Sequence, residues 1–318
     1  SRSHPHPVCA RGHALPWLRM LRLLGIPLAP LSLYGGLWVQ HQHLGLIPGH
    51  PQAWVGLPPA VGGLGTGGAT GAGHVAAWPG IELLEVPTTL SRSEGDVHVY
   101  GNPHIHTGPL NMVAIARNIA AGLERVDPVN AAVYRENQQV LEDRLHRRMF
   151  GDELVDLMGG ETLARLARTG RLLDFLESKE YPAGSGRTLA DRLGGWMKRA
   201  EPIRGRQIIG YHKNWIYFAT EFGLDVVGYI EPKPGIPPTP RHVETMINLI
   251  RDQGIRVILS ANYFDPVKPQ SIADRTGAQL VVVPLSTTGE PGVDTYEDLI
   301  DTWISRLLAA FHDAEAGT

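Results

Sequence analysis

The segment GNPHIHTGP, residues 101–109, carries two histidines that are separated by a single residue. Imidazole nitrogens are good ligands for Zn²⁺ and neighbouring transition metals, so His104 and His106 predict a metal site. The nearby Gly and Pro residues place the pair on a loop, where both rings can turn toward one ion. An isolated His-X-His pair is also typical of two solvent-exposed loop histidines, and this interpretation stays open.

Two more candidate ligands follow short apolar segments later in the chain. His212 comes directly after residues 207–211, and Glu231 directly after 226–230, and both segments are predicted to be strands. Ligands of open parallel sheets collect at the carboxyl ends of strands, where these two side chains would lie. Other roles remain open: His212 as a cap for the next helix, and Glu231 as an ion-pair partner of Lys213, Lys233 or Arg241.

Helices and strands that would position these residues can be predicted from periodicity. Helical spacing runs from 109 to 127 and again from 130 to 149, and the second helix is charged enough to lie largely in solvent, with His146 exposed. From residue 207 strands and helices alternate. The predicted strands are 207–211, 226–230, 257–260 and 280–284, and the predicted helices are 215–222, 241–253, 269–276 and 296–311.

This alternation predicts an α/β fold with a parallel sheet flanked by helices. The length allows two lobes, each with such a sheet, bridged by a long helix. We expect an N-terminal lobe over residues 1–127, a bridging helix over 128–149 and a C-terminal α/β lobe over 150–318.

Composition restricts the kind of ligand. The chain has 29 basic and 32 acidic residues and a formal charge of −3, so no global field draws it to nucleic acid or to an anionic membrane. Cys9 is the one cysteine, which excludes an intrachain disulfide and multi-thiolate zinc cages. A metal site must therefore use histidines and carboxylates. The sequence opens without the pattern of a signal peptide, so we expect that any such peptide was removed or never present.

The first 81 residues differ in composition from the rest. They contain no Asp, Glu or Lys, and much of the stretch consists of Gly, Pro, Leu, Ala, His and Trp. Three explanations are open: a natural low-complexity region, an unusual Pro/Gly-rich domain, or a wrong-frame reading of a GC-rich coding region, which is the hypothesis we favour. Matching tryptic peptide masses for residues 20–75 would rule out the wrong-frame hypothesis.

Two segments resemble a known family. GNPHIHTGPLNMVAIARNIAAGLERVDPVNAAVYREN and IIGYHKNWIYFATEFGLDVVGYIEPKPGIPPTPRH are similar to segments of the zinc and manganese solute-binding proteins of ABC transporters, the cluster A-I family. The resemblance covers about residues 80–315, and the two motifs together are specific. It implies an exported periplasmic or cell-surface protein that captures Zn²⁺ or Mn²⁺ between two lobes, delivers it to a membrane permease, works as a monomer and catalyses nothing.

The resemblance also implies ligands. His104 matches the second histidine ligand of the family and His212 the third, whereas His106 replaces a usual aromatic residue and Gly108 a usual Asp. We therefore keep His106 as a candidate replacement ligand. The motif of the first ligand, DPHxxE, is absent, and a fourth ligand is not cleanly matched. The nearest candidates are His41, His43 and His50 for the first ligand, and Glu231 or Asp294 for the fourth, with Ser286 about where a carboxylate is often found.

Imidazoles from both lobes with one carboxylate or water would give Zn²⁺ a tetrahedral shell. Such a site favours zinc, with manganese as the alternative, and its affinity should fall below about pH 6 because a ligating histidine must be neutral. Two other classes stay open. One is a zinc-dependent hydrolase, which needs further ligands and a general base beside an open coordination position. The other is an adhesin-like structural relative without a working metal site.

Overall fold

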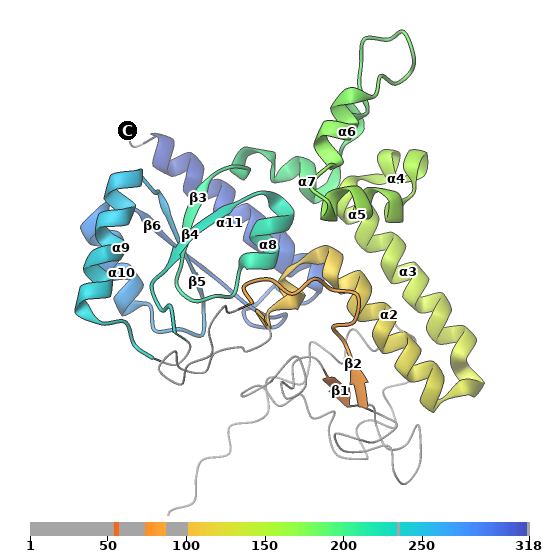
Figure 1. Ribbon diagram of the computed structural model, residues 1–318, viewed down its shortest axis with the longest axis horizontal. Helices are drawn as coiled ribbons and strands as arrows, with labels where there is room; N and C mark the ends of the chain where they lie inside the picture. Colours follow the sequence, from red (N-terminus) through yellow and green to blue (C-terminus); the bar gives the residue numbers. More distant parts are fainter. Residues whose placement is uncertain (1–53, 57–73, 87–100, 234–235, 317–318) are drawn as a thin grey trace, which may run out of the picture.

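The computed structural model describes residues 54–56, 74–86, 101–233 and 236–316 (Figure 1). The candidate first ligands, His41, His43 and His50, therefore lie outside the described residues. Among the residues that are described, no helix combines the length and the apolar character needed to cross a membrane.

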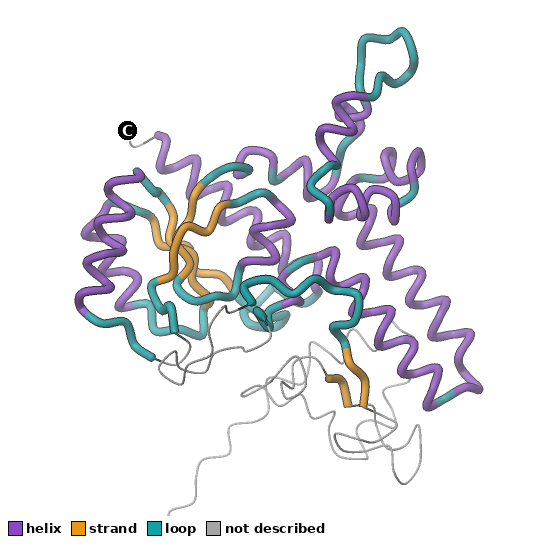
Figure 2. Tube along the Cα trace, viewed as in Figure 1, coloured by secondary structure: helices purple, strands orange, loops and turns teal. Residues whose placement is uncertain are grey.

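A four-stranded parallel sheet forms the centre of the C-terminal half, in the order β4-β3-β5-β6 (Figures 1 and 2). This confirms the predicted parallel sheet, and each strand lies within one or two residues of its predicted range. The strands are β3 (Gln207–Gly210), β4 (Asp225–Tyr229), β5 (Val257–Ala261) and β6 (Gln279–Val283).

Helices cover both faces of this sheet because successive strand side chains point to opposite sides. Ile208 belongs to one apolar cluster together with Trp303 of α11, whereas its neighbour Ile209 belongs to the other, together with Ile247 of α9 and Ile272 of α10. The helices are α8 (Ile216–Phe222) and α11 (Tyr296–Ala316) on the first face, and α9 (Pro240–Gln253) and α10 (Val267–Thr276) on the second.

Two long helices precede the sheet and pack side by side as a hairpin (Figure 1). They are α2 (Pro109–Val126) and α3 (Ala131–Phe150), joined by the short 3-10 helix η5 (Pro128–Asn130). Pro109 is the first residue of α2, where its missing N–H leaves no helical hydrogen bond unmade. One face of α3 is buried and the other exposed. The prediction that His146 is exposed is wrong: the residue is 3% exposed because α5 begins directly against its ring.

Short helices connect α3 to the sheet, and glycines lie at several of their ends. Gly159 adopts φ 78° between α4 and α5, a left-handed conformation that favours glycine. The helices are α4 (Asp152–Met158), α5 (Gly160–Arg168), α6 (Leu172–Ser178) and α7 (Gly195–Arg199), with 3-10 turns η6 (Leu189–Arg192) and η7 (Glu201–Ile203).

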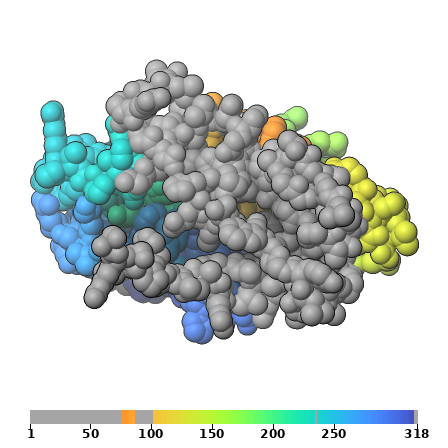
Figure 3. All heavy atoms as spheres, turned by 90° about the horizontal axis from the view of Figure 1, so that it is seen from below, coloured from red at the N-terminus to blue at the C-terminus, as the bar shows by residue number. Residues whose placement is uncertain are grey.

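The described part of the N-terminal region is small. Strands β1 (Trp54–Gly56) and β2 (His74–Ala76) form an antiparallel pair, so the parallel sheet expected for the N-terminal lobe is not among the described residues. The segment after β2 is held on α2, because the Asn118 amide donates to the Ala77 carbonyl at 2.9 Å. Seen from below in Figure 3, the turn of the α2–α3 hairpin and the α9–α10 side of the sheet lie at opposite ends of the molecule.

Candidate metal centre

His212 and Glu231 lie together at the carboxyl ends of two neighbouring strands. Backbone pairing continues past the strand ends, since the Glu231 N–H donates to the Tyr211 carbonyl at 2.7 Å. This pairing brings Nδ1 of His212 to 3.9 Å from Oε1 of Glu231. Both residues are buried, with 7% and 8% exposure. The sheet edge therefore supplies one imidazole and one carboxylate, as the strand pattern predicted.

His104 is brought to this edge by the side chain of Asn102. The Asn102 amide donates to the Lys213 carbonyl and to the Glu85 carboxylate, both at 2.6 Å. Its side-chain oxygen accepts the backbone N–H of His104 at 2.9 Å. Because Lys213 follows His212, Asn102 connects the two histidine loops directly. It is 2% exposed, so water does not compete for these bonds.

A second contact between the two loops runs through Thr107 and Asn214. The Thr107 hydroxyl contacts the carbonyls of His104 at 2.8 Å and Asn214 at 3.2 Å. The Asn214 side-chain nitrogen lies 3.3 Å from Nε2 of His104 and 3.2 Å from the Tyr263 hydroxyl. Asn214 is fully buried and holds the His104 ring on its Nε2 side.

The two imidazoles meet at a separation that suits a shared ion. The ring centres of His104 and His212 are 5.9 Å apart, with the planes at 83°. Zn–N bonds of about 2.1 Å in a tetrahedral shell would place two imidazole centres about 5–6 Å apart. The His106 ring lies 6.1 Å from that of His104 and is half-buried. His106 is positioned by its carbonyl, which accepts the Tyr296 hydroxyl at 2.9 Å.

The predicted ligands are not arranged as a closed cage. Within the described ranges, three His, Cys, Asp or Glu ligand atoms lie within 4.8 Å of one another only in Glu142, His146 and Glu161, which belong to α3 and α5. The predicted centre is instead a pair of imidazoles with Glu231 beside His212. Of the other fourth-ligand candidates, Ser286 is half-buried, and Asp294 is exposed with its backbone N–H bonded to Asp298 at the start of α11.

Gly108 stands where the family usually has an aspartate, and in the structure the carboxyl group of Glu221 lies beside it. Gly108 precedes the first turn of α2, and a Cβ there would lie 2.4 Å from Oε1 of Glu221. Glu221, from α8, accepts the Leu110 N–H at 3.0 Å and so satisfies an otherwise unpaired donor at the start of α2. Burial raises the pKa of Glu221 to about 8. A carboxyl group from the C-terminal sheet region thus occupies the space beside Gly108, where the resemblance leads one to expect the side chain of an aspartate.

Asn102 and Asn214, the asparagines that connect the two histidine loops, were not among the residues predicted from the sequence. The available signal was their position: Asn102 lies two residues before His104, and Asn214 lies two residues after His212. His242 lies in the first turn of α9, but its side chain does not cap the helix. Thr239 is the N-cap, and the His242 ring contacts the Tyr229 carbonyl at 2.9 Å.

The chain matches a known protein family and is similar to named members of related transport systems. Residues 54–148 and 188–310 match the family described as zinc-uptake complex component A, periplasmic. The chain is 25% identical over 231 residues to the iron-binding protein YfeA of Yersinia pestis, covering 70% of this chain and 60% of that protein. It is 23% identical over 198 residues to the high-affinity zinc uptake system protein ZnuA of Brucella abortus, covering 62% and 46%.

The chain therefore spans about half to three fifths of the length of these relatives. The fold is similar to that of the SBP FpvC from Pseudomonas aeruginosa, solved in complex with Mn²⁺, with a TM-score of 0.52 and 19% identity, covering 76% of this chain and 71% of that one. Because the family match includes more than half of the chain and both histidine loops, the chain belongs to the family of zinc-uptake complex component A, periplasmic.

Proposed function

We propose that this protein captures a divalent transition-metal ion outside the cytoplasm and delivers it to the permease of an ABC transporter, without catalysing a reaction. The observation that carries the proposal is the convergence of His104 and His212. The two residues come from loops on either side of the α2–α3 hairpin, and their rings lie 5.9 Å apart. Family membership and the names of the relatives support the same function.

The chemistry of the site favours Zn²⁺, with Mn²⁺ as the alternative. Two imidazoles beside one carboxylate form a mixed nitrogen and oxygen donor set, and imidazole suits zinc better than it suits manganese. In this proposal His104 and His212 are ligands, Glu231 supplies negative charge beside His212, and His106 lies at the rim as a replacement ligand. The metal is the cargo, so it must bind tightly and still be released.

The loops that carry the ligands belong to different parts of the proposed architecture. His104 precedes α2 in the proposed N-terminal lobe, residues 1–127, whereas His212 and Glu231 belong to the proposed C-terminal lobe, residues 150–318. A bound ion would therefore join the two lobes and stabilise their contact, as a bridging metal does in other proteins. We infer that the protein acts as a monomer that the permease recognises in this metal-bound form.

Calorimetric titration of metal-stripped protein with ZnCl₂ and with MnCl₂ tests the proposal. We expect the site at His104 and His212 to bind one ion per chain tightly at pH 7.5, more tightly for Zn²⁺ than for Mn²⁺, and no turnover of ester or phosphoester substrates by the zinc-loaded protein. Absence of tight binding in a folded sample would contradict the proposal and favour a structural relative without a metal site. Turnover would favour the zinc-dependent hydrolase.

A further inference from the structure

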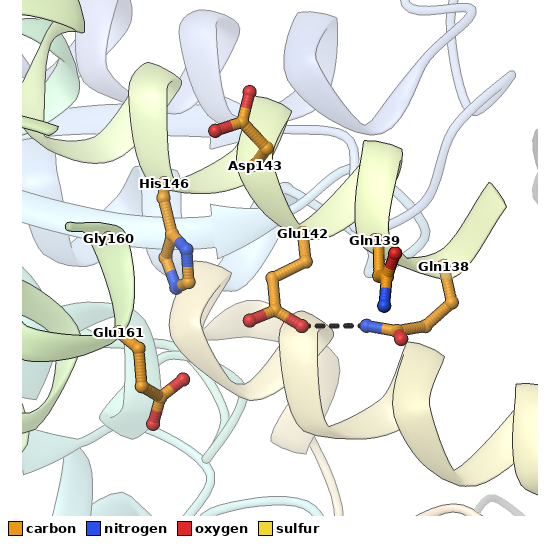
Figure 4. Close-up of a pocket in the computed structure, with 7 residues that line it drawn as sticks. All are labelled: Gln138, Gln139, Glu142, Asp143, His146, Gly160 and Glu161. Atoms are coloured by element: carbon orange, nitrogen blue, oxygen red, sulfur yellow. Dashed lines mark hydrogen bonds between the residues drawn. The ribbon is translucent and has the colours of Figure 1, made fainter. Parts of the chain in front are cut away.

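A second group of potential metal ligands lies on the helices, away from both histidine loops. Glu142 and His146 project from α3 and Glu161 from the start of α5, and one ligand atom of each lies within 4.8 Å of the others. In Figure 4 the His146 ring points between the two carboxyl groups. The three residues, which we name the α3–α5 cluster, line a pocket of about 340 Å³ together with Gln138, Gln139, Asp143 and Gly160.

His146 adds a buried imidazole nitrogen to the two carboxylates of this cluster. The residue is 3% exposed, and its Nε2 atom is buried without a hydrogen-bond partner. A buried polar atom without a partner costs about 1–3 kcal/mol, so natural proteins rarely retain one without a reason. The ring fits only because residue 160 is glycine, since a Cβ at Gly160 would lie 2.3 Å from Nδ1. The fold thus holds a buried imidazole beside two carboxylates.

The protonation states suit a metal. Burial lowers the pKa of His146, which keeps the imidazole neutral near pH 7 and able to ligate. Burial pushes the pKa of Glu142 upward, but hydrogen bonds and charge from Arg117 outweigh that effect, so the pKa lies below its usual value and the carboxylate is ionised. One neutral nitrogen and carboxylate oxygens are donors that Zn²⁺ accepts.

In the structure, the guanidinium of Arg117 pairs with both carboxylates of the cluster. Its guanidinium donates to Glu142, with Nε 2.8 Å from Oε2, and contacts Oε2 of Glu161 at 2.6 Å. The Gln138 amide also donates to Oε2 of Glu142 at 2.6 Å. Each carboxylate offers about four acceptor positions, so Glu142 and Glu161 together still keep lone pairs for an ion. The Arg117 side chain is 42% exposed and can turn into solvent. A purely structural alternative is that the carboxylates serve only to bind Arg117. That role does not explain why Nε2 of His146 is buried without a hydrogen-bond partner.

We propose that Glu142, His146 and Glu161 form a second binding site for a divalent transition metal such as Zn²⁺, for which Arg117 competes. Water completes the coordination shell from the open side of the pocket. The site shares no residue with the histidine pair, His104 and His212, so it stands or falls separately from the proposed function.

Zinc titration in a His104→Ala/His212→Ala background tests this site, since that background removes the proposed cargo site. We expect one remaining ion whose affinity falls at least about tenfold, about 1.4 kcal/mol, on adding His146→Gln. Adding Arg117→Met instead should tighten binding by a similar factor, because the competing cation is gone. A purely structural role for the carboxylates predicts that Arg117→Met lowers stability without raising zinc affinity.

Two results would overturn the proposal: zinc binding that His146→Gln leaves unchanged, or Arg117→Met that weakens binding. If the background variant does not fold, crystals of the wild-type protein grown with excess Zn²⁺ provide the second measurement. An anomalous difference peak at the zinc edge among Glu142, His146 and Glu161 supports the site. An empty pocket with Arg117 still on both carboxylates contradicts it.

Discussion

The histidine pair and the α3–α5 cluster both place a buried imidazole beside carboxylate, but Glu161 of the cluster is exposed and the two sites are built from different partners. At the histidine pair, the loops are held by the uncharged side chains of Asn102 and Asn214. At the α3–α5 cluster, a guanidinium already neutralises much of the negative charge. Under the two proposals, an ion would enter the histidine pair without displacing a cation, whereas at the α3–α5 cluster it would have to displace Arg117.

The two regions also differ in how the chain brings them together. The two histidines are distant in sequence, and their loops are held together by hydrogen bonds of Asn102 and Asn214. The α3–α5 cluster joins helices that follow one another closely and needs only the close approach that Gly160 permits. A perturbation of the loops should therefore affect the first site and leave the second unchanged.

The largest effect is expected from removing both members of the histidine pair. His104→Ala/His212→Ala should lower zinc affinity by about 1,000-fold or more, about 4 kcal/mol, because two ligands of the proposed shell disappear. His242→Ala is the matched control, since this half-buried histidine lies on α9 and contacts a backbone carbonyl instead. Calorimetry measures both variants. Equal affinities for the pair variant and the control would contradict the assignment of the site.

Loss of Asn102 should have the next largest effect. Asn102→Ala removes three hydrogen bonds and leaves the His104 N–H and the Lys213 carbonyl without this partner in buried surroundings. We expect the free energy of unfolding of the metal-free protein to fall by about 3 kcal/mol, with weaker zinc binding as a consequence. The exposed Asn130, whose side chain bonds Asp127, provides the control and should cost less than about 1 kcal/mol on replacement by Ala. Urea denaturation measures both, and equal losses would show that Asn102 is not the connection between the loops.

Glu221 and Glu142 differ in the direction in which their surroundings shift the carboxyl pKa. Burial raises the pKa of Glu221 to about 8, whereas Arg117 brings the pKa of Glu142 below normal despite its burial. Between about pH 4.5 and 8 folded Glu221 keeps a proton that the unfolded chain has lost, so its contribution to stability falls as pH rises, by up to about 1.4 kcal/mol per pH unit.

Glu221→Gln, which keeps an acceptor for the Leu110 N–H, should therefore become more stable relative to wild type as pH rises through this window. Ionised Glu142 stabilises the folded state above its unfolded pKa, and this contribution is lost as pH falls through the lower folded pKa. Glu142→Gln should therefore become more stable relative to wild type as pH falls through this lower window. Thermal unfolding from acidic to mildly alkaline pH measures both variants. Parallel pH profiles for the two would contradict the contrast.

Much of the fold follows from periodicity because each element obeys a local rule. The strands β3 to β6 and the helices between them were predicted within a few residues, since apolar runs, Gly caps and Pro at helix starts are local signals. The position of His212 and Glu231 at adjacent strand ends also follows, because parallel strands present their carboxyl ends at one edge.

The rest of the site depends on contacts that no local pattern encodes. Asn102 matters because the Lys213 carbonyl, far along the chain, lies within reach of its amide. His146 was expected in solvent because α3 is highly charged, and its burial depends on α5 starting with Gly160 against its ring. Glu221 fills the space at Gly108 only because α8 packs against the start of α2.

The central claim is that one metal ion is shared by the imidazoles of His104 and His212. Crystals grown with one equivalent of Zn²⁺ and measured on both sides of the zinc absorption edge test it most directly. We predict that the strongest anomalous difference peak lies about 2.1 Å from a nitrogen of each ring. A strongest peak elsewhere, or two rings that do not approach a common ion, would contradict the account.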